Sequence, residues 1–274
     1  MRRSFAGAFG SNLYWSVVYG LGALALVYLN APVVIALIMS FTDGQTLKFP
    51  PPGLSLRWYL ALLDPVESGP LITAALNSLK IAVLAVIGSC LFAIPASVGA
   101  SRFTPRSAAL IEPLFVAPLV LPSLVYGLAA LMAATAVGIR PSLALVTVGH
   151  IVVFGPLMYR ATSAVASTLD PHLEEASTTL GATRLRTFFF INLPLLLPGI
   201  LAGVFLVFIQ SIDNVSVSLF LADPATSVLP LRMFQMLEEW LDVRVAAMSG
   251  VLIGFTVVIV LIGLRVVPLF RIFR

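Results

Sequence analysis

The stretch EEASTTLGATRLRTFFFINLP, from Glu174 to Pro194, is a long charged and polar interruption in an otherwise apolar sequence. Long apolar runs precede and follow it, and such runs favour buried or membrane-spanning helices over alternating strands. A polar segment held between two spans, with a helix–glycine–helix pattern, predicts a docking surface for a partner outside the membrane.

The composition of the whole chain indicates a membrane protein. Apolar residues make up 59% of the 274 residues and charged residues 10%, whereas soluble domains have roughly 45–50% and about 25%. The mean hydropathy is +1.05. Because an unpaired backbone group is costly in lipid, only helix bundles and closed barrels span membranes, and the continuous apolar runs select helices. We therefore predict an all-α integral membrane protein that spans the lipid bilayer.

Six apolar segments are each near the ~20 residues that a helix needs to cross the bilayer. The outer loop after the first segment covers about 42–73, and the polar loop between the fourth and fifth covers about 166–194. We expect one transmembrane domain over residues 1–274. The six predicted spans are 15–41, 74–100, 108–137, 142–165, 195–221 and 245–268.

The basic residues predict the orientation of these spans. With the N-terminus inside, ten of the sixteen basic residues are cytoplasmic, which predicts that both termini are cytoplasmic under the positive-inside rule. Their scatter over several loops argues against a nucleic-acid surface. The ten are Arg2, Arg3, Arg102, Arg106, Arg160, Arg184, Arg186, Arg265, Arg271 and Arg274.

Two of the predicted spans contain unusual residues. Pro113, Pro118 and Pro122 predict that the third span bends or breaks against other helices, because freed backbone groups are not tolerated against lipid. His150 in the fourth span is interpreted as a helix–helix hydrogen bond, with a proton relay or a cavity residue as alternatives. No histidine has a partner at metal-ligand spacing and Cys90 is the single cysteine, so we predict no metal site and no disulfide.

The polar loop has its own helix signals. Asp170 and Pro171 suit the cap and first position of a helix, and the acids that follow in its first turn favour its dipole. Gly181 is expected to end this helix in a left-handed conformation. Thr183 is expected to cap a second short helix.

Seven positions of this loop resemble a family signature. The pattern E-A-A, three residues, G, nine residues, I-x-L-P resembles the loop of binding-protein-dependent ABC importer permeases, with a serine at its third position. That resemblance implies a six-helix permease fold like that of type I importers. The matching residues are Glu175, Ala176, Ser177, Gly181, Ile191, Leu193 and Pro194.

Other segments resemble the spermidine/putrescine permease branch. They are SFTDG at 40–44, NSLKIAV at 77–83 and the stretch from Ser211 to Glu238. That branch commonly has an acidic pair where this chain has Asp213 and Asn214. The resemblance implies a polyamine such as spermidine or putrescine as solute. The same machinery carrying an opine, an aminophosphonate or a ferric ion is an alternative, and a secondary transporter is another.

The resemblance also implies partners and a location. A second, homologous permease subunit would complete the pore, and a periplasmic binding protein would deliver the solute. A cytoplasmic ATPase dimer would dock on the loop, in which Glu174 joins the seven signature residues. The expected location is the bacterial inner membrane, with several passes.

The chain itself carries no nucleotide-binding motif. A P-loop needs a lysine followed by serine or threonine, but Phe49 follows Lys48 and Ile81 follows Lys80. We therefore predict that ATP is used by the partner ATPase and that this chain has no catalytic residues and binds no cofactor.

Asp213 is the one acid placed well inside a predicted span, and Gln210 and Asn214 add polar groups nearby. A charge at that depth is costly and usually faces a cavity or a bundle interior. Two interpretations are open for Asp213: a contact for a cationic solute, or a hydrogen-bond centre that holds spans together.

Overall fold

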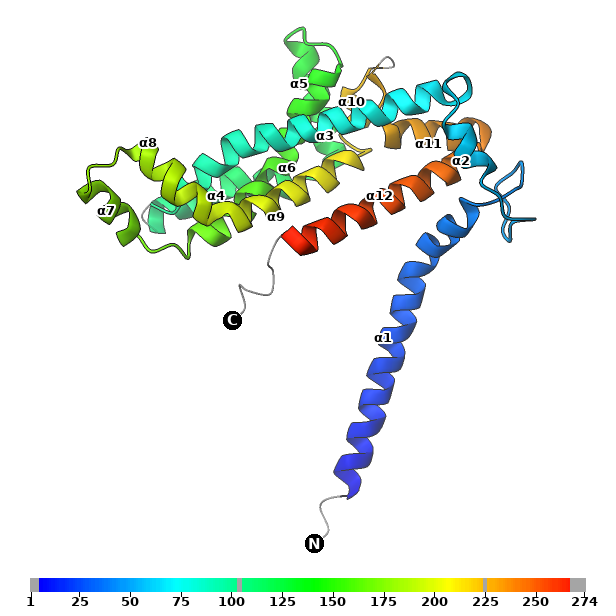
Figure 1. Cartoon of the computed structure of the whole chain (residues 1–274), viewed down its shortest axis with the longest axis horizontal. Helices are drawn as coiled ribbons and strands as arrows, with labels where there is room; N and C mark the ends of the chain where they lie inside the picture. Colours follow the sequence, from blue (N-terminus) through cyan, green and yellow to red (C-terminus); the bar gives the residue numbers. More distant parts are fainter. Residues whose placement is uncertain (1–4, 103–104, 224–225, 267–274) are drawn as a thin grey trace. The chain divides into compact units, whose positions relative to one another are not determined.

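The computed structural model describes residues 5–102, 105–223 and 226–266, and these form helices and connecting loops (Figure 1). The chain divides into two units. The first comprises residues 1–67 and 240–254, and the second comprises 68–239 and 255–274. Arg2, Arg3, Arg271 and Arg274, on which the predicted orientation partly rests, lie outside the described residues, as does the end of the sixth predicted span.

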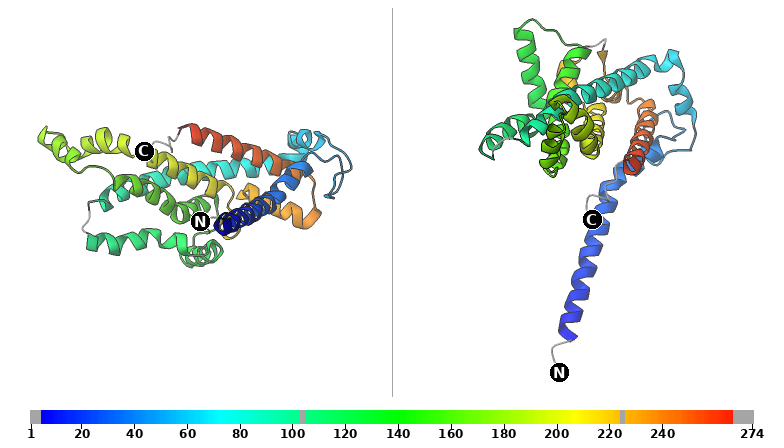
Figure 2. Two further views of the ribbon diagram at one scale, coloured as in Figure 1. Left: turned by 90° about the horizontal axis from the view of Figure 1, so that it is seen from below. Right: turned by 60° about the vertical axis from the view of Figure 1, so that its left-hand side comes forward.

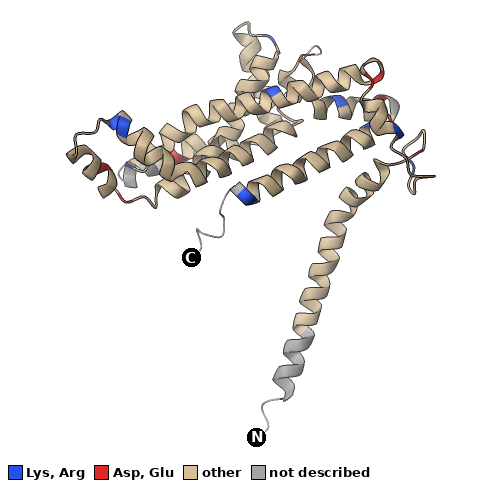
Figure 3. Ribbon diagram, viewed as in Figure 1, with Lys and Arg blue, Asp and Glu red and all other residues tan. Residues whose placement is uncertain are grey.

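Five helices among the described residues are long and apolar enough to cross a membrane, and a bent helix pair would make a sixth. Their charged residues lie mostly at the ends (Figure 3). The five are α1 (Phe5–Met39), α3 (Pro65–Ala100), α6 (Leu143–Ala166), the run from Arg184 to Ile212 that ends in α9 (Leu193–Ile212), and α12 (Arg244–Val266).

The bent pair lies in the third predicted span. Helix α4 (Pro105–Val120) and helix α5 (Ser123–Ala136) meet at 104° (Figures 1 and 2). Pro122 stands at the bend as the cap of α5. A proline ring has no N–H and clashes with the carbonyl four residues earlier, so it kinks or breaks a helix; α4 runs through Pro113 and Pro118, and the break lies at Pro122. The prediction that this span bends or breaks is confirmed.

In the first unit, α1 exposes nearly all of its described apolar side chains, as a helix in lipid or against another subunit does. A short helix, α2 (Arg57–Leu62), follows in the loop after α1. The Tyr59 hydroxyl donates to Ser40 Oγ at 2.7 Å, and Trp58 Nε1 donates to the Gly44 carbonyl at 3.0 Å. These bonds join α2 to the end of α1.

In the second unit, α6 and α9 lie side by side (Figure 2). Glycine makes this contact possible at two positions of α9. A Cβ on Gly199 would lie 2.7 Å from the Ala161 carbonyl oxygen, and one on Gly203 would lie 3.0 Å from Met158 Cα. Small residues of this kind let helix backbones approach closely in membranes, where packing and hydrogen bonds drive association.

The fifth predicted span is wrong as a continuous helix over 195–221. Helix α9 ends at Ile212, Asp213 caps it, and a short helix, α10 (Ser218–Leu221), follows after a break. Asn214 Oδ1 accepts a hydrogen bond from the Val217 N–H at 2.8 Å. Asparagine and aspartate side chains compete with the helix for backbone N–H groups, which favours a turn here. Asp213 is therefore an exposed residue at a helix end.

His150 of α6 bridges this break. Its Nδ1 lies 2.7 Å from Ser211 Oγ on α9, and its Nε2 lies 3.2 Å from Ser218 Oγ on α10. All three side chains are buried. The predicted helix–helix hydrogen bond is confirmed, and it ties α9 and α10 to α6.

Candidate functional site

The segment between α6 and α9, here called the α6–α9 loop, contains three short helices (Figure 1). They are α7 (His172–Thr179), α8 (Arg184–Thr187) and the π-helical turn η1 (Phe188–Asn192). Asp170 Oδ1 accepts from the His172 N–H at 2.9 Å, and Pro171 occupies the cap position. The helix thus begins one residue later than predicted.

The turn between α7 and α8 follows the sequence signals closely. Gly181 has φ of +84°, the left-handed conformation expected of it. Thr183 caps α8 because its side chain accepts from the Arg186 N–H at 3.3 Å. Both predictions are therefore confirmed. They could be made from the sequence because each feature depends only on neighbouring residues.

Glu174 turns towards the body of the second unit. Its Oε1 accepts from Arg102 Nη2 at 2.6 Å and from Asn192 Nδ2 at 2.8 Å. Asn192 is 3% exposed. The sequence did not identify Arg102 or Asn192 as partners of Glu174. For Asn192, the available signal was a lone asparagine within the apolar stretch FFFINLP.

Ser177 also faces inward. Its Oγ lies 2.9 Å from Thr187 Oγ1, and Ser177 is only 7% exposed. Thr187 Oγ1 in turn donates to the Thr183 carbonyl at 3.2 Å. The hydroxyl that distinguishes Ser177 from the alanine of the signature thus has a partner within the α6–α9 loop.

Glu175 and Ala176 form the outward face of α7. The Glu175 side chain is 73% exposed, and Ala176 is exposed beside it. His172 Nδ1 lies 3.1 Å from Glu175 Oε2. The pKa of His172 is raised because this hydrogen bond, together with the charges of Asp170 and Glu175, favours the imidazolium.

The end of the signature lies away from this outward face. Ile191 belongs to η1, while Leu193 and Pro194 begin α9. Ile191 and Leu193 are half-buried and Pro194 is exposed. The signature residues therefore form two groups, one on α7 with its turn and one where the α6–α9 loop enters α9.

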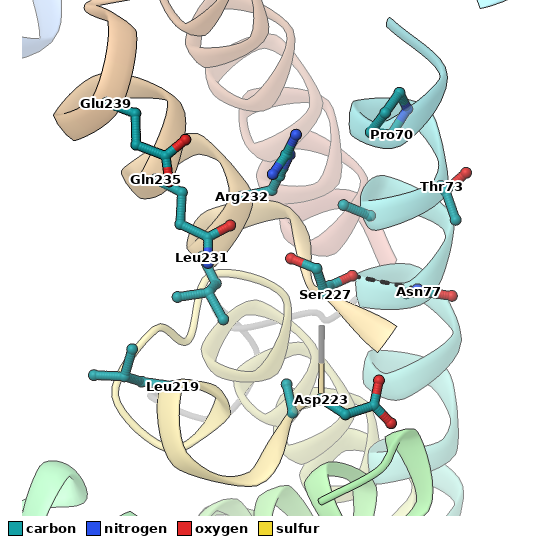
Figure 4. A pocket seen from close by; sticks show the side chains of 12 residues that line it. Pro70, Thr73, Asn77, Leu219, Asp223, Ser227, Leu231, Arg232, Gln235 and Glu239 are labelled. Carbon is teal, nitrogen blue, oxygen red and sulfur yellow. Dashed lines mark hydrogen bonds between the residues drawn. The ribbon is translucent and has the colours of Figure 1, made fainter. Parts of the chain in front are cut away.

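A second feature is a polar cavity of about 720 Å³ between α3 and helix α11 (Leu229–Trp240), shown in Figure 4. Asn77 Nδ2 donates to the Ser227 carbonyl at 3.2 Å, and the Leu229 N–H donates to Ser78 Oγ at 2.8 Å. These bonds hold the start of α11 against α3. Polar residues of the lining are Thr73, Asn77, Asp223, Ser227, Arg232, Gln235 and Glu239.

This cavity was not predicted from the sequence. Its polar residues are spread over α3, the segment after α10, and α11, so no short motif contains them. Arg232 Nε and Ser227 Oγ are buried there without a hydrogen-bond partner. Gln210, Asp213 and Asn214 are not among the lining residues; Gln210 and Asp213 are exposed and Asn214 caps its turn.

Metal-binding groups are not gathered anywhere in the described part of the chain. No set of three histidine, cysteine or carboxylate side chains lies close enough there to hold an ion. The arrangement offers an exposed helix for a partner and a polar cavity in an apolar bundle, which suits movement of a solute.

Comparison with known proteins gives a consistent result. Residues 89–272 match the family described as binding-protein-dependent transport system inner membrane component. The putrescine transport system permease protein PotI of Escherichia coli K12 is 29% identical over 247 residues, covering 88% of this chain and 86% of PotI. The spermidine/putrescine permease protein PotC of the same organism is 26% identical, covering 85% and 87%.

A solved structure supports the fold. A chain of the bacterial alginate ABC transporter, solved with an alginate-bound periplasmic protein, aligns with a TM-score of 0.70 at 15% identity, covering 96% of each chain. The family match spans more than half of this chain, including the α6–α9 loop and α9. This chain therefore belongs to the binding-protein-dependent transport system inner membrane components and is a permease subunit of an ABC importer.

Proposed function

We propose that this subunit forms half of the pathway by which a polyamine such as putrescine or spermidine crosses the bacterial inner membrane. The observation that carries the proposal is the exposed Glu175–Ala176 face of α7, which ends at the left-handed Gly181 within the family signature. The polyamine assignment draws on the similarity to PotI and PotC over most of the chain.

The α6–α9 loop is proposed to couple this subunit to a separate ATPase dimer on the cytoplasmic side. Ala176 lets a partner surface approach closely, and Glu175 offers a carboxylate for a charge-assisted hydrogen bond. When ATP closes the ATPase dimer, α7 would move with it. The attached spans, together with those of a second permease subunit, would then rock between outward-facing and inward-facing states.

The cavity between α3 and α11 is proposed as an outer contact for a cationic solute that a periplasmic binding protein releases. The lining contains two carboxylates, Asp223 and Glu239, and one arginine, Arg232, so its net charge is −1 when all three are ionised. Charges of one sign in a low-dielectric cleft raise the local concentration of an oppositely charged solute. The amide groups of Asn77 and Gln235 supply hydrogen bonds for its amines.

A transport assay of the reconstituted complex tests this function. Proteoliposomes would contain this subunit with its partner permease and ATPase, and a binding protein would be added outside. We expect ATP-dependent uptake of putrescine or spermidine that stops without binding protein. Uptake of only opines, aminophosphonates or ferric ions would contradict the polyamine assignment. Uptake driven by a proton gradient without ATP would contradict the importer itself.

Neutralising Asp223 tests the outer contact. In Asp223→Asn, the side-chain oxygen can still accept from the Thr226 N–H, which it now does at 2.7 Å, so the turn is retained and only the charge is lost. We expect solute imported per ATP hydrolysed to fall by about 3- to 10-fold, as for the loss of one favourable charge contact. Equal falls in uptake and ATP hydrolysis would indicate a structural role instead.

Asp213→Asn is the matched variant, because it removes an exposed carboxylate outside the cavity lining. If Asp213 contacts the solute, this change lowers the same ratio. If both rates fall together and selectivity among polyamines is unchanged, Asp213 is structural.

A further inference from the structure

The side chains of the adjacent acids Glu174 and Glu175 lie on different faces of α7. The side chain of Glu175 is 73% exposed and faces away from the bundle, whereas that of Glu174 is 35% exposed and faces into it. Successive residues of an α-helix are about 100° apart around its axis, so one acid can serve a partner while its neighbour serves the permease. The Glu174 contacts show what that second role is.

One carboxylate oxygen of Glu174 joins three segments that are distant in sequence. Arg102, just after α3, donates to Oε1 at 2.6 Å, and Asn192, just before α9, donates to the same atom at 2.8 Å. These donors lie 72 and 18 residues away from Glu174. Helix α7 is thereby attached to the ends of two membrane-spanning helices at once.

Ser177 supplies a second attachment on the same side of α7. Residues three apart are neighbours on a helix surface, and Ser177 Oγ lies 2.9 Å from Thr187 Oγ1 in a buried position. Thr187 ends α8 and leads directly into η1 and α9. On one face of α7, Glu174 therefore contacts the ends of α3 and α9 and Ser177 contacts α8, and the face that carries Glu175 is left open.

We propose that Glu174 is a positioning residue that makes α7 move as one body with α3 and α9, so that force from the ATPase reaches both helices. This inference rests on the coupling function proposed above. Without Glu174, α7 keeps its covalent link to α9 and the Ser177 contact but loses its link to Arg102. Movement of α7 would then reach α3 only indirectly.

The geometry favours a role in coupling over a role in stability. The side chains of Arg102 and Glu174 are 49% and 35% exposed, and exposed ion pairs contribute little to the free energy of unfolding. Glu174→Gln also retains an oxygen that accepts from the Asn192 amide. This variant therefore removes the charge and leaves the part-buried hydrogen bond to Asn192, and the subunit is expected to insert and assemble normally.

Thiol cross-linking in the assembled complex tests the contact itself. Arg102→Cys and Glu174→Cys are combined in a Cys90→Ser background, and a protease site is inserted at the exposed turn near Gly138, between the two positions. A short bifunctional thiol reagent should hold the two fragments together after cleavage. Arg102→Cys with Glu175→Cys is the control pair and should link much less. Equal linking of both pairs would overturn the inward placement of Glu174.

Charge reversal tests the consequence. Arg102→Glu and Glu174→Arg are each expected to lower binding-protein-stimulated ATP hydrolysis and putrescine uptake by about 10-fold, and the double variant should recover to within about 3-fold of wild type, since contacting residues couple energetically. The Asn192 amide can turn its oxygen towards the new guanidinium. Arg140→Glu, in an exposed loop, is the charge-reversal control and should match wild type.

The outcomes separate this proposal from the function on which it rests. A double variant as impaired as the worse single variant would overturn the role of the ion pair. If Glu175→Ala lowers ATP stimulation while every Glu174 variant is normal, the coupling function stands and this inference fails. If Glu175→Ala is also normal, the coupling function fails, while the cross-linking result still decides whether the contact exists.

Discussion

Gly181→Val is expected to reduce uptake and solute-stimulated ATP hydrolysis to below about a tenth of wild type, although the subunit still inserts. The φ of Gly181 is +84°, and a β-branched residue held in this region costs about 1–3 kcal/mol. A Cβ there meets no atom within 4 Å, so the penalty is in the backbone and not in packing. The turn should relax and displace α7 from its docking position.

Two variants control this experiment. Gly138 has nearly the same conformation, with φ of +80° and no atom within 4 Å of a Cβ, but it lies in the turn before α6. Gly138→Val should therefore lower stability somewhat without uncoupling the subunit. Gly181→Asn should retain much of the activity, because asparagine tolerates the left-handed region. Normal uptake by a well-expressed Gly181→Val variant would contradict the coupling role.

Gly199→Val is expected to have the largest effect on stability. A Cβ at Gly199 would lie 2.7 Å from the Ala161 carbonyl and 3.2 Å from Thr162 Cα, both of which are backbone atoms of α6. Neither can move without moving the helix, so α6 and α9 must separate. Overpacking of this kind costs about 2–3 kcal/mol, and we expect a purified subunit that unfolds roughly 5–10 °C lower.

The single cysteine provides the measurement. Cys90 is partly buried and packs against the core of the second unit, so a fluorogenic thiol reagent should label it as that core opens on heating. Gly22→Val is the matched control, because no atom lies within 4 Å of a Cβ on Gly22. Equal unfolding temperatures for Gly199→Val and wild type would contradict the close contact of α6 and α9.

Local signals predicted the α6–α9 loop well, because its turns depend on neighbours in sequence. The left-handed Gly181 and the Thr183 cap need only a few adjacent residues, and the sequence showed both. The partners of Glu174 could not be predicted in this way. Arg102 lies 72 residues away, and nothing in the sequence indicates which of several basic residues near the spans it meets.

The fifth predicted span shows the limit of apolar length as a guide. Residues 195–221 are apolar enough to be read as one helix, yet the helix ends at Ile212. The polar groups at the break are satisfied by contacts distant in sequence, since Ser211 and Ser218 both meet His150. A span prediction based on the number of apolar residues takes no account of a distant hydrogen-bond partner such as His150.

The cavity between α3 and α11 also depends on the tertiary structure. Asn77 and Ser227 are 150 residues apart in the chain. Only the packing of α11 against α3 brings the polar residues of these two segments together around one cavity. From the sequence, Asp213 was a candidate for either a solute contact or a structural hydrogen-bond centre, because it was the one acid inside a predicted span. The structure shows two other carboxylates in the cavity lining, Asp223 and Glu239, and both lie between the fifth and sixth predicted spans.

The sequence by itself determined the class of this protein, a bundle of apolar helices with a polar signature loop, because lipid permits few folds for so apolar a chain and because caps and turns are local. Only the tertiary structure decided that Glu174 faces inward while Glu175 faces outward, and that α9 ends at Ile212. The first outcome depends on hydrogen bonds between residues far apart in the chain, whose positions are set by how the helices pack. The second depends on the distant His150 contacts together with the local Asn214 turn.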